Sequence, residues 1–286
     1  MKRVNSWITY LQVAPLSLVF LLFLVVPIAT IVVVSFFDYN TTSIIPAFLL
    51  QNYEELLFSP VTWQTYLQTL QFSLITWALT LLIGFTIAYY LAFYVRSPTW
   101  QTVLFLVCTI PFWTSNIIRM ISWIPLLGKN GLINSALLSV GVIHQPLEFL
   151  LFSDFAVVVA YVHQLTIFMI VPIFNAMARI DKRTVEAALD AGASPLEIMR
   201  YIIVPLSKNG IALGSIFVLS IVMGDFFVVK VMSGGGSASV VSALFEDIAV
   251  LQYPPAAAAA VVLLLIVVIM IALILRTVDV RKEIAR

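Results

Sequence analysis

Long apolar stretches separated by short polar segments run through the whole chain. A helix needs about 20 mostly apolar residues to cross a bilayer. Runs of this kind occupy 13–37, 66–95, 101–122, 155–178, 210–232 and 256–275. The pattern predicts an all-α, polytopic membrane protein with six transmembrane helices, which leaves 1–12 and 277–286 as polar ends.

Polar residues and a proline interrupt the third run: Pro111, Thr114, Ser115, Asn116 and Arg119. The segment after it, 123–153, has a turn signal at Gly128–Gly131 followed by a second, shorter apolar stretch. Irregular backbone at membrane depth is tolerated only where protein or a water-filled cavity covers it. This segment therefore predicts a short interfacial or re-entrant helix.

The composition supports lipid as the surroundings of most of the chain. The 286 residues are 62% hydrophobic and 10% charged, whereas soluble domains carry about 25% charged residues. The net charge of +1 gives no basic field for nucleic acid. The run at 13–37 exceeds the ~7–15 apolar residues of a signal peptide, so we expect it to be retained as the first span.

Basic residues give the orientation, because cytoplasmic loops are enriched in Lys and Arg. With a cytoplasmic N-terminus, all but three of the 15 Lys and Arg residues fall on the cytoplasmic side. The three exceptions are Arg119, Lys129 and Lys230, and the loop 38–65 on the opposite side has no basic residue. Both termini and the loop 181–206 are therefore predicted to be cytoplasmic.

The loop 181–206 gathers charge and also contains helix signals. Asp181 is placed to cap a first helix, which should stop at Gly192. The sequence "SPLE" that follows combines Ser194 as N-cap, proline at the first helical position and Glu197 three residues after the cap. We expect two short helices around a tight corner, with the second ending or bending before Pro205.

Small and apolar residues within this loop allow two interpretations. Small side chains at the corner permit close approach of another surface and lose little entropy on docking. The interleaved apolar residues are Val185, Leu189, Leu196, Ile198 and Met199. These could rest on the protein's own spans as an interfacial helix–turn–helix, or they could form a docking element for a soluble partner.

The spacing within the loop resembles a family motif. Three residues separate Glu186-Ala187-Ala188 from Gly192, and nine residues separate Gly192 from Ile202 in "IIVP", which ends at Pro205 and has Val204 in place of the usual Leu. This resembles the EAA motif of type I ABC importer permeases, and the likeness extends from about 66 to 276. The resemblance implies a non-enzymatic subunit whose loop 181–206 forms a coupling helix in a cleft of a cytoplasmic ATPase subunit dimer. The coupling residues would be Glu186, Ala187, Ala188, Asp190, Gly192, Ala193, Ser194, Pro195, Leu196 and Pro205.

The sequence contains no Gly-x-x-x-x-Gly-Lys-Ser/Thr phosphate loop. ATP and magnesium are therefore expected on the partner ATPase, and no cofactor on this chain. The family resemblance also implies a second permease subunit, expected to be a homologous but different chain, and an extracytoplasmic solute-binding protein. The expected location is the bacterial cytoplasmic (inner) membrane.

Polar residues within the apolar runs are candidates for the solute path, because charge at membrane depth is costly. They are Asp225 with Phe226, and Trp113, Asn116, Arg119 and Gln164. Asp225 could instead pair with Lys230 or Arg119, and Arg119 could extend its charged group to the outer interface. The two histidines and one cysteine lie far apart in the sequence, so no metal site is predicted.

"IPFWTSNIIRMISW", "LGKNGLINSALL" and "GDFFVVKVMSGG" resemble permeases of the spermidine/putrescine (polyamine) group. A small cationic solute is expected on that ground, with an opine, an amino-acid derivative or ferric iron as alternatives. A secondary transporter would need an internal repeat and ion-coupling groups. An intramembrane enzyme would need a catalytic motif, and neither signature occurs in the sequence.

Overall fold

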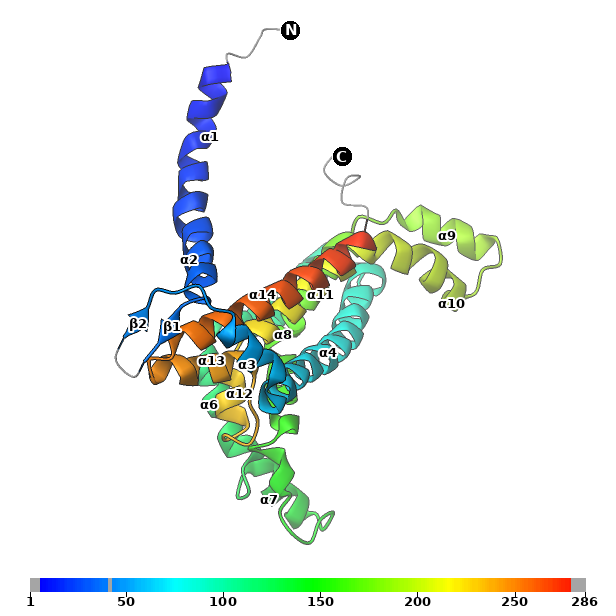
Figure 1. Ribbon diagram of the computed structural model, residues 1–286. Coiled ribbons are helices and arrows are strands. Elements are labelled where there is room, and N and C mark those ends of the chain that lie inside the picture. Colours follow the sequence, from blue (N-terminus) through cyan, green and yellow to red (C-terminus); the bar gives the residue numbers. More distant parts are fainter. Residues whose placement is uncertain (1–5, 41–42, 279–286) are drawn as a thin grey trace. The chain divides into compact units, whose positions relative to one another are not determined.

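The computed structural model describes residues 6–40 and 43–278 and is helical almost throughout (Figure 1). Of the predicted cytoplasmic ends, 1–12 and 277–286, residues 1–5 and 279–286 lie outside the described residues. The chain forms two compact units, one from 1–63 with 243–265 and the other from 64–242 with 266–286. Each unit is described separately.

The first unit begins with a single long apolar helix. It consists of α1 (Ser6–Phe20), the π turn η1 (Leu21–Val25) and α2 (Val26–Val34). The predicted span at 13–37 is displaced toward the C-terminus, because the apolar helix begins earlier and ends earlier, over Tyr10–Val34. The chain leaves the helix at Ser35, whose Oγ bonds to the Val32 carbonyl oxygen.

A small hairpin follows, in which β1 (Asp38–Tyr39) pairs antiparallel with β2 (Ile44–Ile45). Next comes α3 (Gln51–Phe58). Asn52 lies buried on α3 and donates from Nδ2 to the carbonyl oxygens of Ser35 and Phe37, at 3.0 and 2.9 Å. This side chain therefore fixes the end of the first span to α3.

Most helices of the chain belong to the second unit or cross into it. In chain order they are α4 (Pro60–Tyr89), the π turn η2 (Tyr90–Tyr94), α5 (Pro98–Trp113), α6 (Asn116–Leu127), α7 (Leu132–Ser139), η3 (Glu148–Leu150), α8 (Asp154–Met177), α9 (Lys182–Asp190), α10 (Pro195–Ile198), the π turn η4 (Met199–Ile203), α11 (Val204–Gly224), α12 (Phe227–Met232), α13 (Val240–Ala249) and α14 (Tyr253–Arg276).

The lengths and apolar composition of these helices agree with the predicted class, a polytopic membrane protein. Five helices in the described residues are long and apolar enough to cross a bilayer, and a bent pair raises the number to six if it counts as one span. The bent pair is Pro98–Trp113 with Asn116–Ser139, which meet at 89°. The predicted continuous span at 101–122 is therefore wrong in detail. The chain turns sharply at Thr114 and Ser115, neither of which has helical backbone angles.

The segment 123–153 continues from this bend. It contains the end of α6, then α7 and η3, so the expected short helix after the Gly128–Gly131 turn is present. Asn134 on α7 is fully buried and donates to the carbonyl oxygens of Gly128 and Leu147, both at 3.1 Å. Its Oδ1 accepts from the Leu147 amide at 2.7 Å. One buried amide thus holds the turn and the following loop together.

The fifth predicted span, 210–232, is also divided. Its first part belongs to a helix that runs without interruption over Pro195–Gly224, and its second part is the short helix α12. Of the two expected outcomes, an end or a bend before Pro205, the end does not occur. The π turn η4 precedes that proline, and the Val204 amide donates to the Met199 carbonyl oxygen. The wider π turn makes room for the pyrrolidine ring of Pro205 within the helix.

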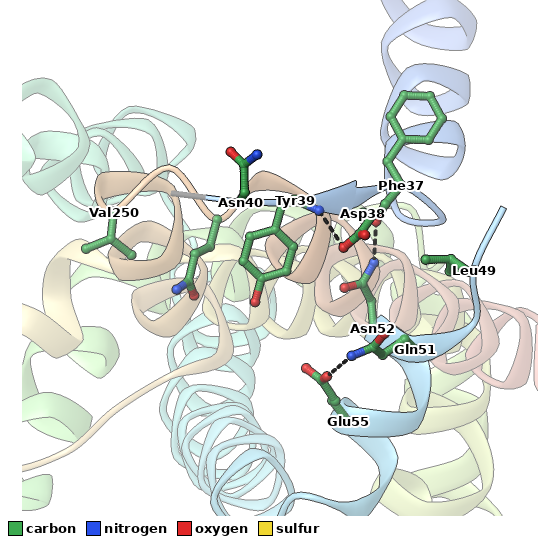
Figure 2. Close-up of a pocket in the computed structure, with 10 residues that line it drawn as sticks. Phe37, Asp38, Tyr39, Asn40, Leu49, Gln51, Asn52, Glu55 and Val250 are labelled. Carbon is green, nitrogen blue, oxygen red and sulfur yellow. Dashed lines mark hydrogen bonds between the residues drawn. The ribbon is translucent and has the colours of Figure 1, made fainter. Parts of the chain in front are cut away.

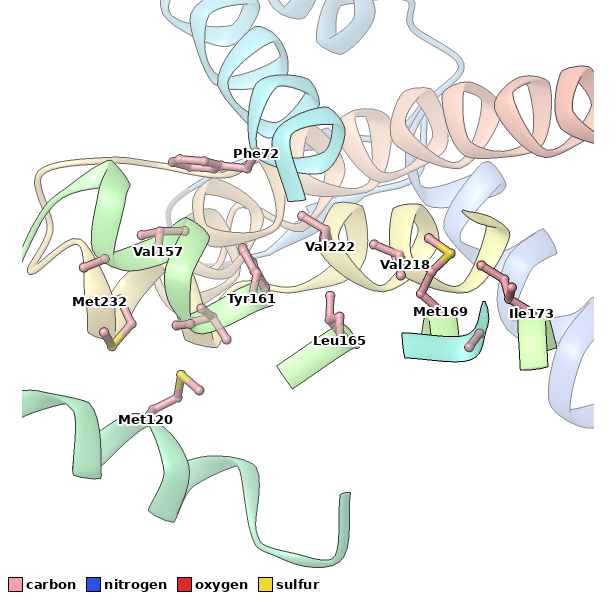
Figure 3. Packing of buried hydrophobic residues seen from close by; sticks show 14 of the residues in the cluster. Phe72, Met120, Val157, Tyr161, Leu165, Met169, Ile173, Val218, Val222 and Met232 are labelled. Atoms are coloured by element: carbon pink, nitrogen blue, oxygen red, sulfur yellow. The ribbon is translucent and has the colours of Figure 1, made fainter. Parts of the chain in front are cut away.

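The hydrophobic core of the second unit centres on α8, which packs along α11 (Figure 3). Tyr161, Leu165, Met169 and Ile173 of α8 have no exposed surface. Glycines allow α11 to approach closely. A Cβ atom on Gly210 would lie 2.3 Å from the Pro172 carbonyl oxygen, and one on Gly214 would lie 2.7 Å from the Met169 sulfur.

Candidate functional site: a cytoplasmic-loop hairpin and a polar break in the third span

Two helices joined by a tight corner, α9 and α10, extend beyond the ends of α8 and α11 (Figure 1). The Asp181 side chain accepts from the Arg183 amide at 3.0 Å and caps α9. The helix ends at Asp190 with Ala191 as its C-cap, and Gly192 follows with φ +86°. The predicted cap and stop of the first helix are therefore confirmed.

The capping box of the second helix is also confirmed. Ser194 Oγ accepts from the Glu197 amide, while Glu197 Oε2 accepts from the Ser194 amide at 2.8 Å and from its hydroxyl at 2.8 Å. The Ser194 amide and hydroxyl donate to the ionised carboxylate, and these two hydrogen bonds lower the pKa of Glu197. The corner between α9 and α10 is thus held by its own hydrogen bonds rather than by a partner.

The hairpin (α9, α10 and the corner between them) presents two different faces. Val185, Ala188 and Ala193 pack against the core cluster of the second unit, and Ile198 is 4% exposed. Leu189 and Leu196 point away from that cluster and are 52% and 76% exposed. Both sequence interpretations therefore hold in part, since one face rests on the protein and the other leaves two leucines uncovered.

The remaining predicted coupling residues lie around this uncovered face. Glu186, Ala187, Asp190, Gly192, Ser194 and Pro195 are all exposed. Pro205 lies inside the continuous helix, two residues after the π turn. The hairpin thus carries a compact surface of small, acidic and apolar side chains, while Pro205 lies at its junction with α11.

Asp225 lies at the break between α11 and α12. Its Oδ1 accepts a hydrogen bond from the Tyr161 hydroxyl at 3.2 Å and from the Val228 amide at 2.8 Å. The second bond caps the start of α12, and the first joins this break to α8. The partner on α8 could not be found from the sequence, because Tyr161 lies within an apolar run 64 residues away.

The other predicted path residues divide into two groups. Trp113, at the end of α5, is 80% exposed, and Phe226 stacks edge-on against Phe227 at 6.5 Å. Asn116, Arg119 and Gln164 instead bury polar atoms that have no hydrogen-bond partner among the described residues. Arg119 is therefore not simply extended to an interface, because its Nε and Nη1 atoms are covered.

The first unit contains an acidic pocket of about 560 Å³ that the sequence did not indicate (Figure 2). Its lining includes Asp38, Tyr39, Asn52, Glu55 and Gln252. Burial and the nearby Glu55 raise the pKa of the Tyr39 hydroxyl. The lack of basic residues in 38–65 was the one sequence signal that pointed to negative charge here.

Comparison with known proteins identifies the class. Residues 84–282 match the family described as the binding-protein-dependent transport system inner membrane component. The chain therefore belongs to this family and is a permease subunit of an ABC importer, a multi-pass and non-enzymatic component of the inner membrane. The predicted family, the all-α polytopic fold and the non-enzymatic class are confirmed.

Individual relatives place the chain near a particular group. It is 30% identical over 235 residues to the spermidine/putrescine permease PotB of Haemophilus influenzae, covering 82% of this chain and 81% of that protein. It is 33% identical over 214 residues to PotB of Escherichia coli K12, covering 74% and 76%. A chain of the bacterial alginate ABC transporter has the same fold, with a TM-score of 0.76 at 16% identity over 96% of this chain and 95% of that one.

Proposed function

We propose that the α9–α10 hairpin is the element through which a separate cytoplasmic ATPase dimer drives this permease. The observation that carries the proposal is the pair of uncovered leucines, Leu189 and Leu196, beside the exposed Glu186 and the positive-φ corner at Gly192. Exposed apolar side chains on an ordered element outside the spans mark a docking surface. ATP and magnesium would be bound by the ATPase, not by this chain.

The continuous helix from Pro195 to Gly224 supports this role. A movement of the corner is passed directly to α11, because no loop separates α10 from α11. The close contact between α11 and α8 at Gly210 then couples both helices. ATPase closure would in this way change the arrangement of the spans between outward- and inward-open states.

The remaining partners follow from the family. A second permease subunit, homologous but different, would complete the path, and an extracytoplasmic binding protein would deliver the solute. Membership of the binding-protein-dependent transport family supports the role of a binding protein. The charge distribution favours cytoplasmic termini, and the loop 181–206 would lie on the same side.

The relatives support a small, amine-containing solute. Both PotB proteins are spermidine/putrescine permeases, so a polyamine is the first solute to test. An amino-acid derivative or an opine is the second candidate, because unpartnered polar atoms at Arg119 favour a solute with a hydrogen-bond acceptor.

Reconstitution tests the coupling proposal. The chain, its partner permease, the ATPase and the binding protein are co-purified, and ATP turnover is measured with and without solute. Wild-type turnover should rise with solute, and Glu186→Ala or Gly192→Val should remove the rise while basal turnover persists. Solute uptake that continues without any ATPase would contradict the proposal and favour an ion-coupled secondary transporter.

A further inference from the structure

Three side chains at the break in the third span bury polar atoms that lack hydrogen-bond partners in the described part of the chain. They are Asn116 with Oδ1, Arg119 with Nε and Nη1, and Gln164 with Oε1. Gln164 is only 9% exposed. Buried polar groups without partners are rare in folded proteins and call for a specific explanation.

The packing of aromatic rings places the α5–α6 break against the segment of α8 that carries Gln164. Phe112 packs edge-on against Phe168 at 5.8 Å, and Trp123 packs edge-on against His163 at 5.5 Å. In the sequence, Asn116 and Arg119 fall between Phe112 and Trp123, and Gln164 falls between His163 and Phe168. The two ring pairs therefore bracket the segments that carry the three side chains.

An electrostatic interaction supports the same placement. The Arg119 charge acts on His163, the neighbour of Gln164 in the sequence. Arg119, Asn116 and Trp123 are spaced three and four residues apart on α6, so they share one face of that helix. Since the Trp123 ring meets His163, this face of α6 is the one directed at α8.

The start of α6 adds further donors at this level. The Arg119 amide bonds to the Ser115 carbonyl oxygen at 3.1 Å, and Ser115 provides no side-chain cap. The amides of the first helical residues accordingly have no acceptor within the helix. The positive end of a broken membrane helix is a favourable place for an anionic group of a solute.

The chemistry of these groups specifies what would bind. A guanidinium is always charged and can only donate, in a planar fork that matches a carboxylate. The side-chain oxygens of Asn116 and Gln164 are acceptors that fit an N–H group. Their natural complement is one molecule that carries both a carboxylate and an amine.

Asp225, the acidic candidate for the solute path, has a structural role. Its Oδ1 already accepts from Tyr161 and from the Val228 amide, so it serves the break between α11 and α12. A solute with positive charge alone would meet only donors and a like charge at Arg119. Among the groups at Asn116, Arg119 and Gln164, a solute that also carries a carboxylate therefore has the better complement.

We propose that Asn116, Arg119 and Gln164 form a solute site that binds the carboxylate of an amino-carboxylate, an amino-acid derivative in the broad sense. The proposal rests on the permease function proposed above and narrows the solute class of that path. Arg119 and the α6 N-terminus hold the carboxylate, while Asn116 and Gln164 accept from the amine.

Two probes that differ only in a carboxylate test this assignment. L-Ornithine is putrescine with a carboxylate added. The difference between their affinities for the purified permease–ATPase complex in nanodiscs therefore measures the contribution of the carboxylate. Calorimetry should detect ornithine, and putrescine should not displace it. Arg119→Gln should weaken ornithine binding by about tenfold to a hundredfold, the range for a hydrogen bond to a charged group.

Matched variants separate the site from general charge and folding effects. Lys129→Gln removes the same charge from the exposed Lys129–Glu148 pair and should leave binding unchanged. Arg119→Lys should bind at an intermediate level, because an ammonium lacks the fork. Gln164→Leu should weaken binding yet keep or raise the melting temperature, because it removes a buried acceptor without a partner.

Several outcomes would overturn the assignment. These are putrescine binding as tightly as ornithine, no ornithine binding at all, or ornithine binding that Arg119→Gln leaves unchanged. Loss of permease pairing in Arg119→Gln and a lower melting temperature in Gln164→Leu would show that these groups pair with the second permease or the fold instead. Failure of the wild-type chain to co-purify with an ATPase would count against the coupling function alone.

Discussion

Tyr161 and Asp225 join the middle of α8 to the break between α11 and α12 through a hydrogen bond of 3.2 Å. Tyr161 has no exposed surface, so its hydroxyl depends on this acceptor. The same carboxylate caps α12 through the Val228 amide. A residue that seemed a candidate for solute contact is thus also a structural junction between three helices.

This junction predicts different effects for two substitutions of Asp225. Asp225→Asn keeps a side-chain oxygen that can accept both bonds, so assembly and uptake should be largely preserved. Asp225→Ala leaves the Tyr161 hydroxyl buried without a partner and should cost about 1–3 kcal/mol of stability. Thermal unfolding of the purified complex measures this, with Tyr161→Phe as the control that removes the donor. Loss of uptake in Asp225→Asn at unchanged melting temperature would instead assign its charge to the solute path.

The corner of the hairpin depends on the backbone of Gly192. Its φ is +86°, and a Cβ atom there would meet nothing within 4 Å. Gly192→Ala should therefore act through backbone strain of about 1 kcal/mol rather than through a clash. Solute-stimulated ATP turnover should fall. Gly224→Ala is a matched control, because its Cβ also meets nothing and its φ is not positive. Equal effects of both variants would contradict a special role for the corner.

The two faces of the hairpin predict opposite consequences of the same substitution. Leu189→Ser and Leu196→Ser change exposed side chains, so stability should hold while co-purification of the ATPase decreases. Ile198→Ser changes a residue that is 4% exposed and should lower the melting temperature first. Pull-down yield and thermal unfolding, measured on the same samples, separate these effects. Normal ATPase capture by a Leu189→Ser, Leu196→Ser double variant would rule out the exposed face as the contact.

Close packing between α11 and α8 predicts a strong effect at Gly210. A Cβ atom would lie 2.3 Å from the Pro172 carbonyl oxygen and 2.8 Å from the Ala176 Cβ. Because backbone cannot move aside easily, Gly210→Ala should destabilise the chain by about 1–3 kcal/mol. Thermal unfolding measures the loss, and Gly224→Ala again supplies the comparison. A melting temperature equal to the wild-type value would mean that the two helices separate at this point.

The capping box predicts a dependence on pH. The two hydrogen bonds from Ser194 lower the pKa of Glu197 in the folded chain. The cap is therefore fully effective at any pH above the pKa of Glu197 in the unfolded chain, which is about 4.3. Its contribution is lost as the pH falls through the lower, folded pKa. Protection factors of the α10 amides should decrease over that acidic range in the wild type. Glu197→Gln should show no such decrease, and identical profiles would exclude the carboxylate as the cause.

Local rules predicted the hairpin in detail because its signals lie within a few residues of one another. Asp181, Gly192, Ser194 and Glu197 specify caps and stops that need no tertiary contact. Apolar run length likewise predicted the class, and it predicted the number of spans if the bent pair α5–α6 counts as one. The helix does not end before Pro205, one of the two expected outcomes, because the preceding π turn accommodates the proline.

The site at the third span could be predicted only in part. Its polar residues were visible in the sequence, yet their partners depend on which helices pack together. The bond between Tyr161 and Asp225 and the bracketing of Gln164 by two ring pairs arise from tertiary packing. The acidic pocket lined by Asp38 and Glu55 also combines segments that are distant in the sequence, since Gln252 completes it.

The helix from Pro195 to Gly224 has one further mechanical consequence. At 1.5 Å per residue, its 30 residues form a rod of about 45 Å. One end carries the corner of the hairpin, and the other end is held at Asp225. A small tilt imposed at the first end therefore becomes a displacement of several ångströms at the second, where α12 begins. Geometry of this kind amplifies a modest domain movement into the opening or closing of a passage.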